Sequence, residues 1–205
     1  PVMVCTALSA EPTTAAVTIE LVVHGQAVLE FTPGTDASAA AVAHCHKWKY
    51  VHAKYVDKWH VSAPRESGIM RFGYAIVDGD KTLGVLFGQA THDRTVHNGI
   101  EIQAMVVDPD ARRRGVGTQL LQAAAYMAKC QGLEQLLGEA FPSSMPFYES
   151  AGWVPAGIPS SPDPNAAALM DWVTLHIEED GDYSDMATLR ELCATVGGIW
   201  MKKVL

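Results

Sequence analysis

The 205-residue sequence lacks the patterns typical of membrane-spanning and secreted proteins. No apolar run reaches the roughly 18–20 residues needed to cross a bilayer. The N-terminus has no basic segment followed by an apolar one, so we expect no signal peptide. Cysteine is scarce, and no C-x-x-C pair occurs, which predicts free, buried thiols in a reducing cytoplasm. The four cysteines are Cys5, Cys45, Cys130 and Cys193.

Positive charge is also scarce, because the formal net charge is −8. A general nucleic-acid binder would need a basic surface, so this class is disfavoured. Apolar residues make up 48% of the chain and charged residues 19%, which is typical of a folded globular protein. The length suits one domain with a sizeable core, and we therefore predict a single domain over residues 1–205.

The most informative stretch runs from Ile100 to Thr118. Residues 100–107 are apolar and rich in β-branched side chains, which predicts a buried strand. The sequence Asp108-Pro109-Asp110 ends that strand, because proline cannot continue a ladder and aspartate favours turns. A helical period of apolar residues starts at Val116, so a strand, a turn, a loop and a helix follow one another here.

The loop between this strand and helix has the sequence Arg112-Arg113-Arg114-Gly115-Val116-Gly117. Glycines allow close approach of the backbone to a ligand, and the helix start offers unpaired N–H groups and a positive dipole end. Together with three arginines, this favours a phosphate or pyrophosphate ligand. Neither the Walker A pattern nor the dinucleotide fingerprint is present. The alternative is a charged loop before an ordinary helix.

The remaining elements alternate between strands and helices, which indicates an α/β protein. Asp78-Gly79-Asp80 predicts a hairpin. Asp36 or Ser38 is expected to cap the first helix, and Gly132 to end the second. The predicted helices are Ser38–His60, Val116–Gln131, Ser143–Ala151 and Ser184–Val196. The predicted strands are Val17–Val23, Ala27–Phe31, Ile69–Val77, Lys81–Gln89, Ile100–Val107, Leu133–Glu139, Ala168–Ile177 and Ile199–Val204.

Two stretches of this sequence resemble the motifs of the GNAT superfamily of N-acetyltransferases. Arg112, Gly115 and Gly117 match its [Gln/Arg]-x-x-Gly-x-[Gly/Ala] motif, which binds acetyl-CoA. Downstream, the sequence from Met145 to Trp153 resembles the second motif, a short helix carrying Phe-Tyr-Glu. The motif region spans residues 99–154. The resemblance implies a GNAT-like twisted mixed sheet, with splayed central strands, flanked by helices.

The same resemblance implies which residues hold acetyl-CoA, the co-substrate. The pantetheine arm would lie along the strand at Met105, Val106 and Val107. Many family members bind this arm with an asparagine after the fifth strand, but that region reads Ala140–Ser144 here, where a serine is the candidate substitute. The residues expected around the pyrophosphate are Arg112, Arg113, Arg114, Gly115, Val116, Gly117 and Thr118.

Glu101 and Tyr148 are the predicted catalytic residues. Glu101 lies where some GNAT members carry a catalytic glutamate, and a protonated amine must lose a proton before it attacks. The alternative for Glu101 is an ordinary strand carboxylate, with His92 and His97 as reserve bases. Tyr148 lies where the family places the tyrosine next to the thioester, as the acid for the departing thiolate. The alternative is that Tyr148 only packs in the core and that its hydroxyl forms a hydrogen bond with the backbone.

The resulting hypothesis is a cytoplasmic acyltransferase that moves an acetyl group from acetyl-CoA to an amine of a small molecule or peptide. The alternative is a non-catalytic acyl-CoA-binding sensor or scaffold, because a fold does not fix a function. We expect neither nucleic acid nor membrane as a partner, and a homodimer remains open. No metal is expected, because no carboxylate or cysteine completes a ligand set with the histidines. The histidines are His44, His46, His52 and His60.

The predicted Ser38–His60 helix is also the candidate wall of the acceptor site, together with the loop before the central strand. Trp48, Tyr55 and Trp59 share one face of this helix and could supply cation–π surface to an amine. The alternative is that the aromatic stripe packs on the core of the protein, as on most amphipathic helices.

Overall fold

The computed structural model describes residues 26–48, 56–57, 70–91, 98–157 and 198–205. Two compact units divide the chain: Pro1–Gln89 with Gln103–Ala124, and Ala90–Ile102 with Ala125–Leu205. The prediction of a single domain therefore stays a prediction. Several predicted elements lie outside the described residues: the strands at 17–23 and 168–177 and the helix at 184–196.

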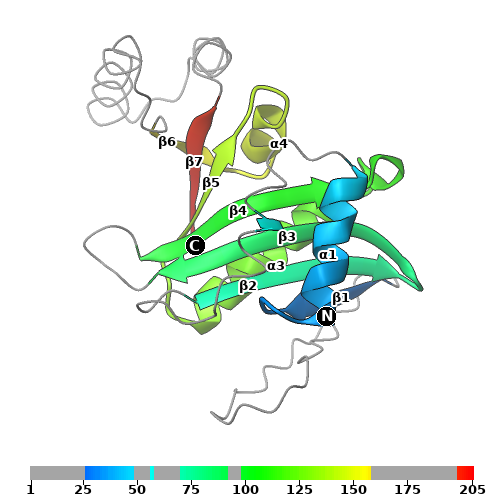
Figure 1. The fold of residues 1–205 in the computed structure, drawn as a ribbon. Coiled ribbons are helices and arrows are strands. Elements are labelled where there is room, and N and C mark those ends of the chain that lie inside the picture. The colour runs from blue at the N-terminus through cyan, green and yellow to red at the C-terminus, as the bar shows by residue number, and fades with distance from the viewer. Residues whose placement is uncertain (1–25, 49–55, 58–69, 92–97, 158–197) are drawn as a thin grey trace, which may run out of the picture. The chain divides into compact units, whose positions relative to one another are not determined.

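The strands form one seven-stranded mixed sheet in the order β1-β2-β3-β4-β5-β7-β6 (Figure 1). The first unit contributes β1 (Ala27–Phe31), β2 (Met70–Asp78) and most of β3 (Lys81–Thr91), whose Ala90 and Thr91 belong to the second unit. The second contributes β5 (Gln135–Ala140), β6 (Val154–Gly157) and β7 (Ile199–Val204). The units share β4 (Gly99–Val107), because their boundary falls after Ile102. Strand β6 was not predicted from the sequence, because four residues containing a proline give a weak strand signal.

Antiparallel pairing connects β1 to β2, where Phe31 lies opposite Gly73. Strands β2 and β3 are consecutive and joined by the predicted turn, in which Gly79 has a φ of +56°. A glycine with positive φ suits a two-residue hairpin turn, so this part of the prediction is confirmed.

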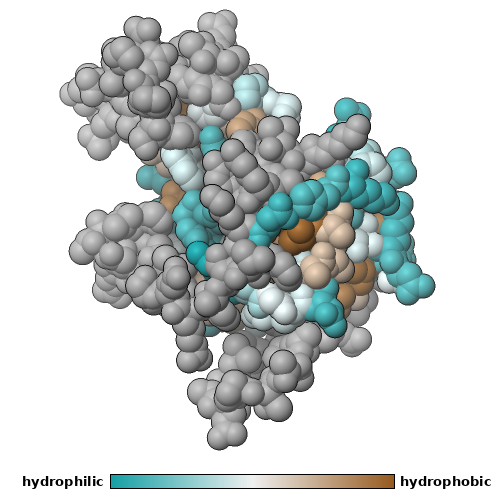
Figure 2. Space-filling view, viewed as in Figure 1, coloured by the Kyte–Doolittle hydropathy of each residue, from teal (hydrophilic) through white to brown (hydrophobic). Residues whose placement is uncertain are grey.

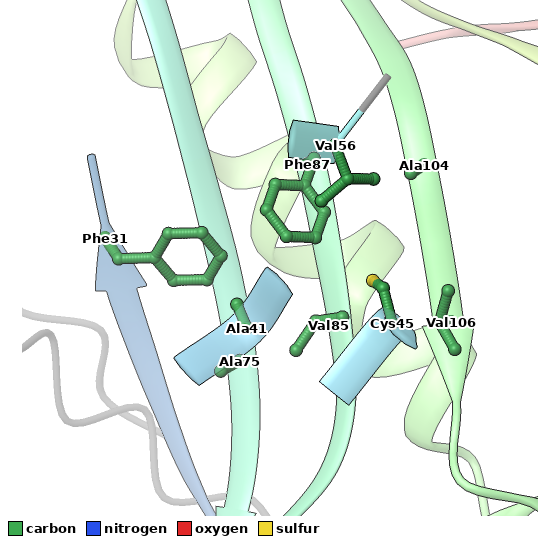
Figure 3. Packing of buried hydrophobic residues seen from close by; sticks show 9 residues of the cluster. All are labelled: Phe31, Ala41, Cys45, Val56, Ala75, Val85, Phe87, Ala104 and Val106. Carbon is green, nitrogen blue, oxygen red and sulfur yellow. The ribbon is translucent and has the colours of Figure 1, made fainter. Parts of the chain in front are cut away.

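Helix α1 (Asp36–Lys47) packs on one face of the first unit's strands. Ala41 and Cys45 of the helix contact an apolar cluster that contains Phe31, Val85 and Phe87 (Figure 3). Seen from the same side, coloured apolar residues form a patch that is bordered by hydrophilic ones (Figure 2). The other members of the cluster are Val56, Ala75, Ala104 and Val106.

The predicted length and cap of this helix were wrong. The helix ends at Lys47, and Trp48 is its C-cap, whereas the prediction extended it to His60. Of the rest of the predicted range, Val56 and Asp57 are helical, and residues 49–55 and 58–60 lie outside the described residues. Thr35, not Asp36 or Ser38, is the N-cap, and its hydroxyl accepts the Ser38 N–H at 3.2 Å.

Helix α3 (Val116–Cys130) begins in the first unit, on the opposite side of the sheet from α1 (Figure 1). Gly84 of β3 allows this close packing: a Cβ there would lie 2.8 Å from Val116 Cγ1 and 3.2 Å from the Val106 carbonyl oxygen. Gly132 follows the helix with a φ of +67°, as the sequence predicted. Cys130 is free but exposed, so the prediction of a buried thiol was wrong at this position and right at Cys45.

None of the helices in the described part of the chain is long and apolar enough to span a bilayer.

Candidate functional site

The segment after β4 forms a tightly bonded turn ahead of the arginine loop. Asp108 starts this turn: its N–H donates to the Leu83 carbonyl at 2.8 Å, and its Oδ1 accepts the Asp110 N–H at 2.9 Å. A short 3-10 helix, η1 (Pro109–Ala111), follows. The Ala111 N–H donates to the Asp108 carbonyl at 2.8 Å. The turn ahead of the loop is therefore anchored to β3 at Asp108, the first residue of the turn.

Asp108 is buried with only 1% of its surface exposed, although it carries a carboxylate. Lys81 Nζ lies 3.5 Å from its Oδ2. Burial alone would raise the pKa of Asp108, but the Asp110 N–H and the Lys81 ammonium favour the charged form, so the pKa lies below its usual value. Asp108 is thus a charged residue that holds the turn before the loop in place. From the sequence it was predicted only to end the strand.

The loop presents its three arginines to solvent. Arg112, Arg113 and Arg114 are all exposed, whereas Val116 is buried and fixes the start of α3. Arg113 has a φ of +60° and Gly115 a φ of +80°. A non-glycine residue in this left-handed region costs free energy, and such conformations cluster at ligand-binding sites.

The first hydrogen bond of α3 runs from the Gln119 N–H to the Gly115 carbonyl at 2.9 Å. The N–H groups of Val116, Gly117 and Thr118 precede this bond, so they have no partner within the helix. With the dipole of a 15-residue helix behind them, they form an electropositive cradle. The structure therefore brings the predicted glycines, arginines and helix start together in one unit.

A second group of predicted residues meets where the pairing of β4 with β5 ends. The two strands are parallel from Gly99–Gln135 to Ile102–Gly138. Strand β4 continues to Val107 and β5 to Ala140, without further pairing between them. Two parallel strands can splay apart only beyond the last hydrogen-bonded pair of their ladder, and here both strands continue beyond that pair.

Tyr148 lies over the end of this ladder. It is buried on helix α4 (Met145–Ser150), and its ring packs edge-on against Trp153, with centroids 5.0 Å apart. A Cβ placed on Gly138 would lie 3.6 Å from the Tyr148 hydroxyl oxygen and 3.5 Å from Ile102 Cβ. The tyrosine oxygen therefore lies on the Ile102 face of the ladder, at a position without a side chain.

Glu101 lies at the same end of the ladder but on its other face. It pairs with Leu137, one position before the last pair, and its side chain is partly exposed. Successive side chains of a strand point to opposite faces, so Glu101 points away from the Ile102 face. The structure thus brings Glu101 and the Tyr148 hydroxyl to the same end of the ladder, on opposite faces.

Residues 71–155 match the family model described as an acetyltransferase (GNAT) domain. The matched segment contains both the arginine loop and Tyr148. Over these residues the chain is similar to GNAT acetyltransferases.

Solved structures give the same fold for GNAT proteins from other organisms. The chain is similar to the ribosomal-protein-S18-alanine N-acetyltransferase from Escherichia coli, at 14% identity and a TM-score of 0.53, over 87% of this chain and 93% of that chain. It is also similar to IAA acetyltransferase from Bacillus cereus, at 17% identity and a TM-score of 0.53, over 88% and 99% of the two chains. At these identities the likeness shows the fold, and it confirms the predicted GNAT-like mixed sheet. No curated protein matches the sequence.

The segment predicted to bind pantetheine, Met105–Val107, lies on β4 beyond the last pair with β5. Val106 is buried in the apolar cluster under α1, while Met105 and Val107 are partly exposed on the other face. The backbone of this segment is thus held in place by the packing of one side chain.

Ser144 lies in the region where many GNAT proteins carry the asparagine that binds pantetheine. Its hydroxyl is hydrogen-bonded within the protein. Its hydroxyl accepts the Phe141 N–H at 3.0 Å and lies 3.2 Å from the Phe141 carbonyl oxygen. This bonding closes the turn that leads into α4. Ser144 therefore has a structural role, and whether a serine replaces the GNAT asparagine stays a prediction.

The two described histidines of α1 lie in different surroundings. His46 Nε2 lies 2.8 Å from Asp57 Oδ1, whereas His44 is buried and its Nε2 has no hydrogen-bond partner. Burial lowers the pKa of His44, against the opposing effect of Asp108. Within the described ranges, no group of three or more His, Cys, Asp or Glu residues could hold a metal. His52, His60, His92 and His97 lie outside these ranges.

Sequence reasoning missed one glycine that shapes this site. Gly84 allows α3 to approach β3, whereas a Cβ on Gly138 would make only ordinary van der Waals contact with the Tyr148 hydroxyl. A glycine inside a strand often marks a close approach of another group, so Gly84 did carry a signal.

Proposed function

We propose that this protein transfers an acetyl group from acetyl-CoA to an amine of a small molecule or peptide. One observation carries the proposal: the family match spans an electropositive helix start and a buried tyrosine whose hydroxyl lies at the end of the β4–β5 ladder. The first feature suits the pyrophosphate of CoA, and the second suits the departing thiolate. We place the protein in the cytoplasm, acting without nucleic acid or membrane.

The cofactor is held by the loop and by β4. The N–H groups of Val116, Gly117 and Thr118 donate to the pyrophosphate, and the exposed Arg112–Arg114 side chains add charge-assisted bonds. The edge of Met105–Val107 that faces away from β3, beyond the last pair with β5, holds the pantetheine arm. The left-handed conformations of Arg113 and Gly115 support this role, because they turn successive N–H groups to one side.

The reaction needs one base and one acid. Glu101, acting through a water molecule, removes a proton from the acceptor ammonium, and the neutral amine attacks the thioester carbonyl. A C–N bond forms, the C–S bond breaks, and the CoA sulfur leaves with negative charge. Tyr148 donates its proton to that sulfur, the new amide nitrogen loses its surplus proton to solvent, and a proton from solvent restores the Tyr148 hydroxyl. A bridging water suits Glu101, since its side chain lies on the opposite face of the ladder from the Tyr148 hydroxyl.

The non-catalytic sensor needs the same loop but neither acid nor base. The placement of the Tyr148 hydroxyl at the end of the β4–β5 ladder supports the enzyme, because the reaction needs an acid where the thioester would lie. Tyr148 also packs against Trp153, which keeps water from its ring.

Calorimetric titration of acetyl-CoA tests the cofactor site. Arg112→Ala removes a charge-assisted contact and Gly117→Glu puts a carboxylate into the cradle, so we expect acetyl-CoA affinity to fall about tenfold in the first variant and more in the second. Lys129→Ala, an exposed cation at the other end of α3, is the matched control and should bind normally. Unchanged affinity in both loop variants would place the cofactor elsewhere.

A further inference from the structure

A lysine on β7 reaches the end of the helix that carries Tyr148. Lys203 Nζ donates to the Ala151 carbonyl at 2.5 Å, and it lies 3.8 Å from the place of a Cβ on Gly152. Met201, two residues earlier on β7, pairs with Gly138, so Lys203 and the Gly138 position lie on the same face of the sheet. Lys203 is therefore on the face where the Tyr148 hydroxyl lies.

The turn that Lys203 binds also fixes Tyr148. Helix α4 ends in a Schellman motif: the Trp153 N–H donates to the Tyr148 carbonyl at 3.0 Å, and the Gly152 N–H donates to the Glu149 carbonyl at 2.9 Å. Gly152 has the left-handed φ of +75° that this motif requires. The Tyr148–Trp153 ring contact is the apolar contact of the motif. Ala151, the C-cap, presents its carbonyl to Lys203.

We propose that Lys203 is a positioning residue for Tyr148. Its ammonium binds the C-cap carbonyl of α4, where a cation is favoured, and so holds the Schellman turn against β7. When the turn is held in this position, it keeps the Tyr148 ring against Trp153 and the Tyr148 hydroxyl over Gly138. This inference rests on the proposed role of Tyr148 as general acid. It assigns to β7 a part in the reaction, although β7 lies far along the chain from both GNAT motifs.

A double-mutant cycle separates positioning from a general effect on folding. Lys203→Met keeps the length of the side chain but removes its donor, and we expect kcat to fall about tenfold, since small displacements of a reacting group are costly. The KM for acetyl-CoA should not change. In a Tyr148→Phe enzyme, where no hydroxyl remains to be positioned, Lys203→Met should leave kcat unchanged. Lys203→Arg keeps a donor and should restore most of the activity.

The adjacent Lys202 provides the matched control. It has the same charge and similar exposure, but it pairs with Leu137 and points to the opposite face of the sheet. Lys202→Met should therefore leave kcat unchanged. Amide hydrogen exchange gives a readout that needs no turnover: Lys203→Met should speed exchange about tenfold in the segment 145–153, and Lys202→Met should not.

Three results would overturn the proposal. Equal exchange in the two lysine variants would show that Lys203 does not hold the turn. An equal fall in kcat with and without the Tyr148 hydroxyl would show a general structural effect. Full activity of Tyr148→Phe alone would remove the acid role itself. That last failure belongs to the proposed function, and it is distinguishable because the exchange experiment reports on Lys203 independently.

Discussion

At the scale of single residues, Tyr148 carries the most specific chemistry. Substitution Tyr148→Phe keeps the ring contact with Trp153 and deletes only the hydroxyl. We predict a fall in kcat of about 10²-fold, because general acid catalysis contributes on this order, with acetyl-CoA affinity nearly unchanged. Steady-state kinetics with calorimetry of the same variant measures both. A variant with wild-type kcat, under conditions where chemistry limits the rate, would contradict the acid role.

Glu30 on β1 is a residue whose charge opposes folding. It is partly buried opposite Tyr74, and burial raises its pKa from 4.5 to about 6. Above pH 6 the folded protein must hold this carboxylate in its charged form. Below about pH 4.5 the group is protonated in both folded and unfolded chains, so the cost disappears.

The substitution Glu30→Gln should therefore raise the free energy of unfolding at pH 7.5 by ~1 kcal/mol, a value reduced for partial exposure. The gain should shrink as the pH falls through 6 and vanish near 4.5. Urea unfolding over this range measures it, with the exposed Glu134→Gln as control. A gain that does not depend on pH would mean that packing, not ionisation, is responsible.

At the scale of elements, the turn at Asp108 bonds to β3 and leads into the Arg112–Gly117 loop. The folded-state pKa of Asp108 lies below its ordinary value, so its ionised form stabilises the fold. This contribution is fully present above the unfolded-state pKa and is lost as the pH falls through the folded-state pKa. Asp108, the first residue of the turn ahead of the loop, is thus fixed most firmly at neutral pH.

We predict that Asp108→Asn unfolds at lower urea concentration than the wild type at pH 7, because the carboxylate beside Lys81 is lost. The difference should narrow as the pH falls below about 4, the ordinary range of an aspartate. Asp110→Asn, an exposed neighbour whose N–H and not its carboxylate enters the turn, should behave like the wild type. Equal stability of Asp108→Asn and wild type at pH 7 would show that the Asp108 carboxylate does not stabilise the turn.

Elements with a strong local pattern were predictable from the sequence. β4 was predicted from its run of β-branched residues, the β2–β3 hairpin from Asp-Gly-Asp, and α3 from its period and the terminal Gly132. α1 was not predicted to the right length, because its end depends on packing around Trp48. β6 was not predicted, since a short strand is defined by its pairing with β7 and not by its own residues.

The residues of the candidate site could be named from the sequence, and their roles stay predictions. The motif spacing indicated Arg112, Gly115, Gly117 and Tyr148, and the resemblance to GNAT proteins indicated Glu101. On which face of the β4–β5 ladder the Tyr148 hydroxyl lies could not be predicted, because that depends on how α4 packs. Lys203 could not be predicted as a partner of α4, since its contact with Ala151 spans 52 residues of sequence.

At the scale of the whole molecule, a GNAT fold with an anion-ready loop fits both an enzyme and an acyl-CoA sensor. The two differ in only one respect: whether the protein moves the acetyl group. Binding of acetyl-CoA, by itself, is expected of both. A measurement that follows the acetyl group therefore tests the account most directly.

That measurement is CoA release from acetyl-CoA in the presence of a panel of amines, with mass spectrometry of the amines. The panel includes small primary amines and peptides with free N-termini. We predict CoA release that depends on an amine, a matching acetylated product, and loss of both in Gly117→Glu. Tight binding of acetyl-CoA with no acetylated product from any amine of the panel would contradict the enzyme and favour the sensor.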